Sequence, residues 1–280
     1  MHREKAHRQG NGGDRKGALF IVGLGPGSVE HLTPKAKQAI ESSDCVVGYT
    51  GYIALVQGLI KGKEVFSTNM THEMERCKKA IELASSGKRV SLVSSGDSGI
   101  YGMAGLALEL ALRRFPVLES GAGCFDIEVI AGVPAFVCAA AMLGAPLMLD
   151  FASISLSDLL TPWENIEKKL EGACIADFVL IFYNPKSSRR TEGIKKAFHI
   201  VRKYRGKDTP VGIVRNGARE GEEAVITDLR GVEGHYGMID MLSIIIVGNS
   251  GTKVQHGRMI TPRGYNLEAT PPYPPLDKGG

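Results

Sequence analysis

Short apolar runs followed by glycine-rich segments recur along the first half of the chain. Three apolar runs are each followed by a glycine-containing loop. The run 19–22 precedes Gly23–Gly27, the run 90–93 precedes Ser94–Gly99, and the run 127–130 precedes Ala131–Ala135. Runs of mostly apolar residues are typical of strands that are buried on both faces of a parallel sheet. We therefore expect three strands whose carboxyl ends carry loops, the position at which open parallel sheets bind small molecules.

Helical patterns alternate with these strands. Thr33 and Pro34 suit the N-cap and first residue of a helix that ends near Ser42, and a strand is predicted at 45–48. Apolar residues at helical spacing predict a helix over about 71–84, followed by a strand at 89–94 and a helix over 99–113. This alternation predicts a parallel, doubly wound α/β domain over residues 17–148.

The second half of the chain is less regular. It predicts a strand over 177–183, a helix over about 189–204 and a strand over 210–214. The later runs 223–227, 243–247 and 258–261 lie too close together for crossover helices between all of them. We expect an α/β domain with a mixed sheet over residues 149–265. The basic head, 1–16, and the proline-rich tail, 266–280, are expected to be disordered.

Composition narrows the class of protein. The 280 residues are 43% hydrophobic and carry a net charge of only +4, part of which lies in the first sixteen residues. A charge this small does not by itself indicate nucleic-acid binding. The head has no apolar core, so we expect neither a signal peptide nor an anchor. Residues 129–149 are uncharged, but glycines and prolines interrupt them, which favours a strand and a buried helix over 134–143 rather than a membrane span. The expected location is the cytoplasm.

The chain has five cysteines, Cys45, Cys77, Cys124, Cys138 and Cys174. No two of them form a C-x-x-C pair. Most are expected to be small buried apolar residues, with a shared iron–sulfur cluster as the alternative. The histidines form no H-x-x-x-H or H-E-x-x-H pattern, so no protein-bound metal is expected.

The first glycine-rich loop differs from a dinucleotide-binding loop. Ser28 stands at the third glycine position, and Pro26 removes a backbone donor. The expected acidic residue after the second strand is absent, and the chain has no G-K-[ST] sequence. These features predict a ligand that carries a base, a ribose and a charged amino-acid portion but no phosphates. Asp97 in the second loop suits ribose hydroxyls or an ammonium, or else the start of the following helix.

Several motifs occur in the order found in one family. They are V-G-x-G-P-G from Val22, S-G-D at Ser95–Asp97, A-G-V-P-A from Ala131, Phe182–Pro185 and Val214–Gly217. Over residues 18–263 the chain resembles the tetrapyrrole methylases. The segments 153–164 and 183–187 resemble those members that methylate precorrin-3B, or its cobalt-containing counterpart, at C-17 with ring contraction in cobalamin biosynthesis.

The resemblance implies a homodimeric, S-adenosylmethionine-dependent C-methyltransferase of two α/β domains, with the cofactor in the cleft between them. The cofactor contacts that it implies are Pro26, Ser95, Gly96, Asp97, Ile100, Pro134, Ala135, Asn184 and Gly217. The chain departs from many relatives at Ser98, where they have proline, and at Pro134, where related methylases have threonine.

The tetrapyrrole carboxylates require cations, and basic residues cluster after the predicted strands of the second domain. The candidates for substrate binding are Ser157, Asp158, Thr161, Lys186, Arg189 and Arg215, with Arg190 and Arg219 nearby. For the basic residues, the alternative is that they are ordinary exposed side chains without a ligand. For Ser157, Asp158 and Thr161, the alternative is that they form an ordinary helix start before Pro162. The sulfonium methyl is already activated, so no general base is required and none is assigned. A ribosomal-RNA methylase of the same family and a non-catalytic tetrapyrrole carrier are the competing functions.

Overall fold

The computed structural model describes residues 16–115 and 125–266. The expectations for residues 1–15, for Cys124 and for residues 267–280 fall outside this part of the chain. The chain divides into two compact units, one ending at Ala135 and the other beginning at Phe136. Each unit contains its own five-stranded sheet.

The sheet of the first unit is entirely parallel and has the strand order β3-β2-β4-β1-β5. Its strands are β1 (Gly17–Gly23), β2 (Cys45–Tyr49), β3 (Glu64–Thr68), β4 (Arg89–Ser94) and β5 (Phe125–Ile130). Its helices are α1 (Pro34–Ser42), α2 (Thr50–Leu55), α3 (Glu73–Ser85) and α4 (Ala104–Arg114). The predicted parallel α/β unit is confirmed, and Thr33 caps α1 as expected by accepting a bond of 3.1 Å from the Ala36 amide.

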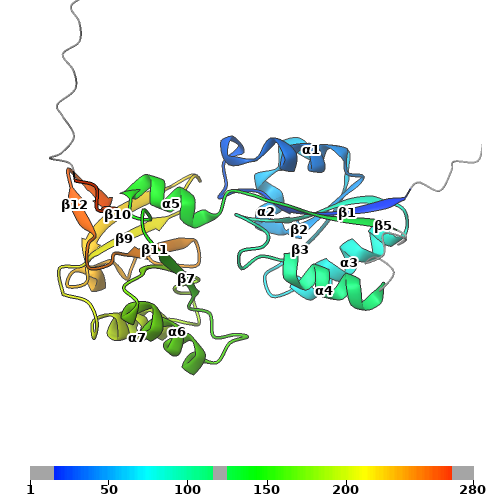
Figure 1. Ribbon diagram of the computed structural model, residues 1–280. Coiled ribbons are helices and arrows are strands. Elements are labelled where there is room, and N and C mark those ends of the chain that lie inside the picture. Colours follow the sequence, from blue (N-terminus) through cyan, green and yellow to red (C-terminus); the bar gives the residue numbers. More distant parts are fainter. Residues whose placement is uncertain (1–15, 116–124, 267–280) are drawn as a thin grey trace, which may run out of the picture. The chain divides into compact units, whose positions relative to one another are not determined.

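Helices cover both faces of this sheet. Leu19 and Leu92 pack with α3 and α4 on one face, whereas Val22 packs with α1 and α2 on the other, because alternate strand residues point to opposite faces. Figure 1 shows α1 on one face and α3 and α4 on the other. The chain therefore leaves the adjacent strands β1 and β4 toward opposite faces. Such a switch point opens a crevice at the carboxyl ends of the two strands.

The second unit has a mixed sheet of order β10-β9-β11-β8-β7, in which only the β7–β8 pair is parallel. The mixed sheet predicted for this half is confirmed. Its strands are β7 (Phe151–Ser155), β8 (Val179–Tyr183), β9 (Pro210–Arg215), β10 (Glu223–Asp228) and β11 (Ser243–Val247). A smaller sheet joins β6 (Gly144–Ala145), β12 (Lys253–Gln255) and β13 (Arg258–Ile260).

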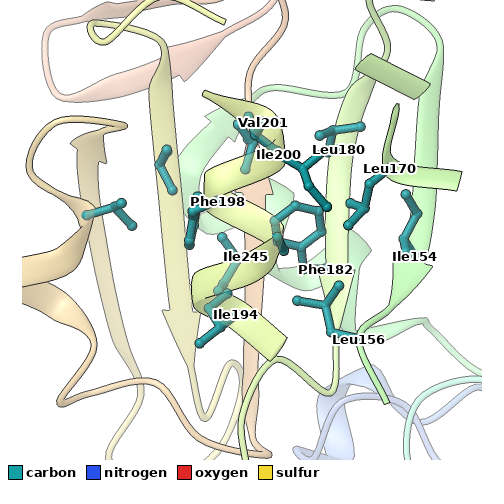
Figure 2. Packing of buried hydrophobic residues seen from close by; sticks show 14 of the residues in the cluster. Ile154, Leu156, Leu170, Leu180, Phe182, Ile194, Phe198, Ile200, Val201 and Ile245 are labelled. Carbon is teal, nitrogen blue, oxygen red and sulfur yellow. The ribbon is translucent and has the colours of Figure 1, made fainter. Parts of the chain in front are cut away.

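One face of the mixed sheet is covered by α6 (Trp163–Ile175) and α7 (Glu192–Val201). Phe198 of α7 lies against Phe182 of β8 with ring centroids 5.9 Å apart, and Ile245 of β11 belongs to the same core (Figure 2). These large buried side chains form part of the core between α7 and the mixed sheet.

The other face of the mixed sheet is covered by α5 (Ala135–Leu143). Leu143 fills the space above Gly212 so closely that a Cβ at Gly212 would lie 2.3 Å from it. The next residue, Gly144, pairs with Met259 in the small sheet. The division between the units therefore falls at Ala135, earlier than the expected position at residue 148, because α5 buries its apolar side on the second sheet.

One further expectation differs from the structure. The helix predicted from Gly99 begins only at Ala104, because residues 98–103 form a turn in which the Ala104 amide donates to the Ser98 carbonyl at 2.9 Å. By contrast, the strand and the helix predicted in the uncharged segment 129–149 are confirmed, because the segment folds as the end of β5, α5 and β6. Within residues 16–115 and 125–266, no helix combines the length and apolar character that a membrane crossing needs.

Candidate functional site

Three glycine-rich loops meet at the carboxyl ends of β1, β4 and β5. Gly25 and Gly96 exchange two backbone hydrogen bonds of 3.0 and 2.7 Å, and both adopt positive φ angles, +76° and +66°. A Cβ at Gly23 would lie 2.6 Å from the Gly96 carbonyl oxygen, and a Cβ at Gly132 would lie 2.2 Å from the same atom. Glycine is required at these positions because the three backbones touch, which brings the predicted loop residues of the first unit together.

Asp97 connects two of these loops. Its Oδ1 accepts a bond of 2.8 Å from the Gly99 amide, and its Oδ2 accepts one of 2.9 Å from the Gly132 amide. The alternative in which Asp97 starts the next helix does not hold, because α4 begins at Ala104. The carboxylate therefore has a structural role here in addition to the ligand contact that the sequence predicts.

The loop amides are largely satisfied within the protein. Gly25 and Gly96 use theirs on each other, and Gly99 and Gly132 use theirs on Asp97. A pyrophosphate site needs several such amides pointing at the ligand. The geometry therefore agrees with the prediction of a ligand without phosphates, and a carboxylate at the centre of the loops suits a cationic one.

Ser94, the last residue of β4, was missed by the sequence analysis. Its side chain is buried, and its Oγ has no hydrogen-bond partner in the part of the chain that the structure describes. Leaving a buried hydroxyl unpaired costs about 1–3 kcal/mol, so native structures rarely do so without a ligand or water. This orphaned hydroxyl at the root of the Ser95–Asp97 loop fits a ligand that brings its own polar groups.

Loops in the second unit carry the other predicted residues. Asn184 adopts a positive φ of 51° just after β8, and its Nδ2 donates to Ser155 Oγ at 2.9 Å. The Ser157 amide donates to the same hydroxyl at 3.3 Å. Ser155, which the sequence analysis did not single out, therefore joins a predicted cofactor residue to a predicted substrate residue.

The segment after Ser157 is exposed. Asp158 is exposed and Thr161 is half-buried. Helix α6 begins at Trp163 after Pro162, without a side-chain cap. The alternative in which these polar residues cap an ordinary helix is therefore not realised.

The basic candidates differ in their surroundings. Lys186 Nζ donates to the Tyr236 carbonyl at 2.7 Å, and Arg189 is exposed. Arg215 Nε pairs with Asp240 Oδ2 at 2.8 Å, and this hydrogen bond raises the pKa of the Arg215 guanidinium. Asp240 was not predicted from the sequence, because it lies far along the chain in the turn before β11.

The turn after β9 contains Gly217 between two residues of positive φ, Asn216 at 52° and Ala218 at 57°. A Cβ at Gly217 would lie 3.2 Å from Val214 Cγ1 and 3.5 Å from Met142 Sδ. Backbone strain of this kind collects at functional sites.

The described cysteines, Cys45, Cys77, Cys138 and Cys174, are buried free thiols. The pKa of Cys45 and the pKa of Cys77 are both raised to about 11, mainly by burial, and a hydrogen bond to Glu64 contributes to the raised pKa of Cys45. In the described residues, no group of three or more His, Cys, Asp or Glu side chains is placed to hold a metal ion.

Together these features define a two-unit α/β protein with a glycine-lined switch point in its first sheet. The family model for "Tetrapyrrole (Corrin/Porphyrin) Methylases" matches residues 18–233, so the chain belongs to the tetrapyrrole methylase family.

Several named relatives indicate which kind of tetrapyrrole methylase the chain is similar to. A cobalt-factor III methyltransferase of Priestia megaterium is 48% identical over 91% of this chain and 46% of its own length, so the chain spans about half of that relative. A probable cobalt-factor III C(17)-methyltransferase of Salmonella typhimurium is 47% identical over 89% of this chain and 100% of its own length. The crystal structure of the methyltransferase CobJ has a TM-score of 0.81 and 33% identity, covering 88% of this chain and 100% of that one.

Proposed function

We propose that this protein transfers a methyl group from S-adenosylmethionine to C-17 of cobalt-factor III in cobalamin biosynthesis. The observation that carries the proposal is the glycine-lined switch point whose amides are occupied within the protein, which suits a phosphate-free nucleoside cofactor. The substrate follows from similarity, since the two relatives described above bear cobalt-factor III in their names at 48% and 47% identity.

The residues fit S-adenosylmethionine chemically. Asp97 supplies a carboxylate for the ribose hydroxyls or the ammonium group, and Ser94 supplies an unpaired hydroxyl at the same strand end. The proposed contacts are Pro26, Ser95, Gly96, Asp97, Ile100, Pro134, Ala135, Asn184 and Gly217. The cofactor, when bound, supplies an activated methyl group on a sulfonium. The chain's task is to orient C-17 toward that methyl group and to exclude water.

The macrocycle carries several carboxylates, which we propose are bound by Lys186, Arg189 and Arg215, while Ser157, Asp158 and Thr161 position the ring. The family resemblance further supports a homodimer in the cytoplasm that binds no nucleic acid. Light scattering of the purified protein tests the dimer, and a monomer at micromolar concentration would contradict it.

The direct test is an anaerobic incubation with methyl-labelled S-adenosylmethionine and either cobalt-factor III or precorrin-3B. The product is analysed by mass spectrometry and carbon NMR. Label at C-17 of a contracted ring, formed from the cobalt substrate, is the expected result. Label formed only from precorrin-3B would overturn the cobalt assignment. S-adenosylhomocysteine binding without methylation of either macrocycle would overturn the substrate assignment and make ribosomal RNA the next candidate.

A further inference from the structure

Arg190, in the loop after β8, is a half-buried arginine that forms no ion pair within the described part of the chain. Its Nη2 donates to the thioether sulfur of Met241 at 3.4 Å, and a thioether is a weak acceptor. Arg215 of the same unit is also half-buried, but it pairs with Asp240. A guanidinium that is partly withdrawn from water and has no counter-charge is a favourable place for an anion.

The backbone holds Arg190 in a fixed position. The Ser187 amide donates to the Arg190 carbonyl at 3.0 Å, and the Arg190 amide donates to Ser187 Oγ at 3.1 Å. These two bonds close a tight turn between residues 187 and 190. Because the turn fixes the backbone and Met241 holds one nitrogen of the guanidinium, little conformational freedom remains to be lost when a ligand binds.

The segment 236–241 orients two cations of this loop through neutral acceptors. Lys186 Nζ donates to the Tyr236 carbonyl at 2.7 Å, and Arg190 donates to Met241 at the other end of the segment. A carbonyl or a thioether fixes the direction of a cation without cancelling its charge, whereas a carboxylate would cancel it. The loop therefore carries two oriented positive charges that the described residues do not neutralise.

The start of α7 adds to the preference for an anion. Arg190 lies two residues before Glu192, the first residue of α7, and the N-cap Thr191 makes no side-chain cap bond. The amino end of a helix carries a partial positive charge, so cations are disfavoured there and anions are favoured. Glu192 is acidic, but its Oε1 already accepts a bond of 2.8 Å from Lys195 Nζ. A cation at this position therefore serves a purpose other than the stability of α7.

We propose that Arg190 binds a side-chain carboxylate of the tetrapyrrole substrate, and that Met241 is the positioning residue that orients its guanidinium. This inference rests on the proposed function, which supplies a macrocycle with several carboxylates as the ligand. Arginine suits this task because its planar fork can donate two parallel hydrogen bonds to one carboxylate. Asn184, a proposed cofactor contact, belongs to the same loop, so this loop would contact both the cofactor and the substrate.

The test uses variants of both residues. Arg190→Met removes the charge, whereas Arg190→Lys keeps the charge and loses the fork. Met241→Leu keeps the apolar volume and removes the acceptor sulfur, and it is made in the wild type and in Arg190→Met. Lys195→Met is the matched control, because it removes one positive charge from an exposed ion pair with Glu192. Binding of cobalt-factor III is followed by its absorbance, binding of S-adenosylhomocysteine by calorimetry, and folding by Tm.

Arg190→Met is expected to bind cobalt-factor III about tenfold more weakly, because a charge-assisted hydrogen bond is lost, and Arg190→Lys should lie between this variant and the wild type. Met241→Leu should weaken binding about threefold in the wild type and not further in Arg190→Met, because it acts through the guanidinium. All of these variants should keep the Tm of the wild type and its S-adenosylhomocysteine affinity within about twofold. Lys195→Met should bind both ligands as the wild type does.

Wild-type macrocycle affinity in Arg190→Met would overturn the proposal, and so would an equal loss in Lys195→Met, which would indicate an effect of net charge alone. A further loss from Met241→Leu in the Arg190→Met background would overturn the positioning role of Met241. Weaker S-adenosylhomocysteine binding in Arg190→Met would also overturn the proposal, because the guanidinium would then serve the carboxylate of the cofactor. A wild-type chain that binds S-adenosylhomocysteine but no cobalt-factor III would instead overturn the proposed function.

Discussion

Asp97 Oδ2 accepts a hydrogen bond of 2.9 Å from the amide of Gly132, which lies 35 residues further along the chain. The bond joins the loop after β4 to the loop after β5, two strands that are separated in the sheet by β1. One carboxylate thus helps to shape the backbone of the proposed cofactor site, and it is also a proposed ligand contact.

Replacement of Asp97 by asparagine should weaken both the loops and the cofactor site. An amide NH₂ group in place of one carboxylate oxygen would face an N–H donor, so one of the two backbone bonds is lost. We expect a loss of about 1–2 kcal/mol in the free energy of unfolding and about tenfold weaker S-adenosylhomocysteine binding. Urea unfolding and calorimetry measure the two effects.

Asp126→Asn is the matched control for this change, because Asp126 lies in the same unit and makes an exposed ion pair with Lys16. Its effect on both quantities should be small. An Asp97→Asn variant that resembles this control would contradict the role of the carboxylate.

A methyl group at Gly132 should disrupt the meeting of the three loops. The added Cβ would lie 2.2 Å from the Gly96 carbonyl oxygen and 2.6 Å from the Gly23 carbonyl carbon, and both of these atoms belong to the backbone. We expect Gly132→Ala to cost about 1–3 kcal/mol of stability and to abolish measurable S-adenosylhomocysteine binding. Gly58→Ala is the control, because nothing lies within 4 Å of a Cβ there. Equal Tm values for the two variants would show that the loops are not packed as described.

Removal of the Arg215 charge should weaken macrocycle binding without affecting the cofactor. Asp240 holds the guanidinium in place through Nε, and four of the five N–H donors of an arginine then remain for other partners. Arg215→Met is expected to raise the KM for cobalt-factor III about tenfold, with kcat and S-adenosylhomocysteine affinity within twofold of wild type. Arg230→Met, which breaks the exposed pair with Asp208, should leave KM unchanged. An unchanged KM in Arg215→Met would exclude this residue as a substrate contact.

The buried thiols Cys45 and Cys77 should make stability fall at alkaline pH. Burial raises their pKa to about 11 in the folded chain, whereas an exposed thiol has its ordinary value of about 9. As the pH rises from 9 toward 11, the unfolded chain loses these protons before the folded chain does, so unfolding becomes easier. At pH 10 each thiol should contribute about 1 kcal/mol to this loss, and below pH 8 the contribution should vanish.

Urea unfolding of the wild type and of the double variant Cys45→Ala, Cys77→Ala at pH 7.5 and 10 measures this difference. The variant starts from a lower stability because of its cavities but should lose less between the two values. Parallel losses in the two proteins would contradict the pKa assignment. Tyrosines and lysines also titrate in this range, and their effect cancels in the comparison.

The sequence by itself predicted most of the strands and several helices, because these depend on local patterns. Residues 89–94 and 243–247 were predicted at their observed limits, and the helix from Pro34 to Ser42 follows from Thr33 and Pro34. The departures from a dinucleotide-binding loop, above all Pro26 and Ser28, are likewise visible in the sequence, as are the motifs of the family. Local spacing therefore sufficed for the class of fold, and it predicts a cofactor without phosphates.

Only the tertiary structure decided which distant groups meet. The partners of Asp97, the Asp240 carboxylate beside Arg215 and the orphaned hydroxyl of Ser94 depend on strands that are far apart in the chain. The same holds for the position of α5. The spacing of its apolar residues is compatible with packing on either sheet. In the structure α5 packs on the second sheet, because Leu143 fits over Gly212. Periodicity reports which face of an element is buried, whereas the identity of the contacting atoms is set by the packing of the whole unit.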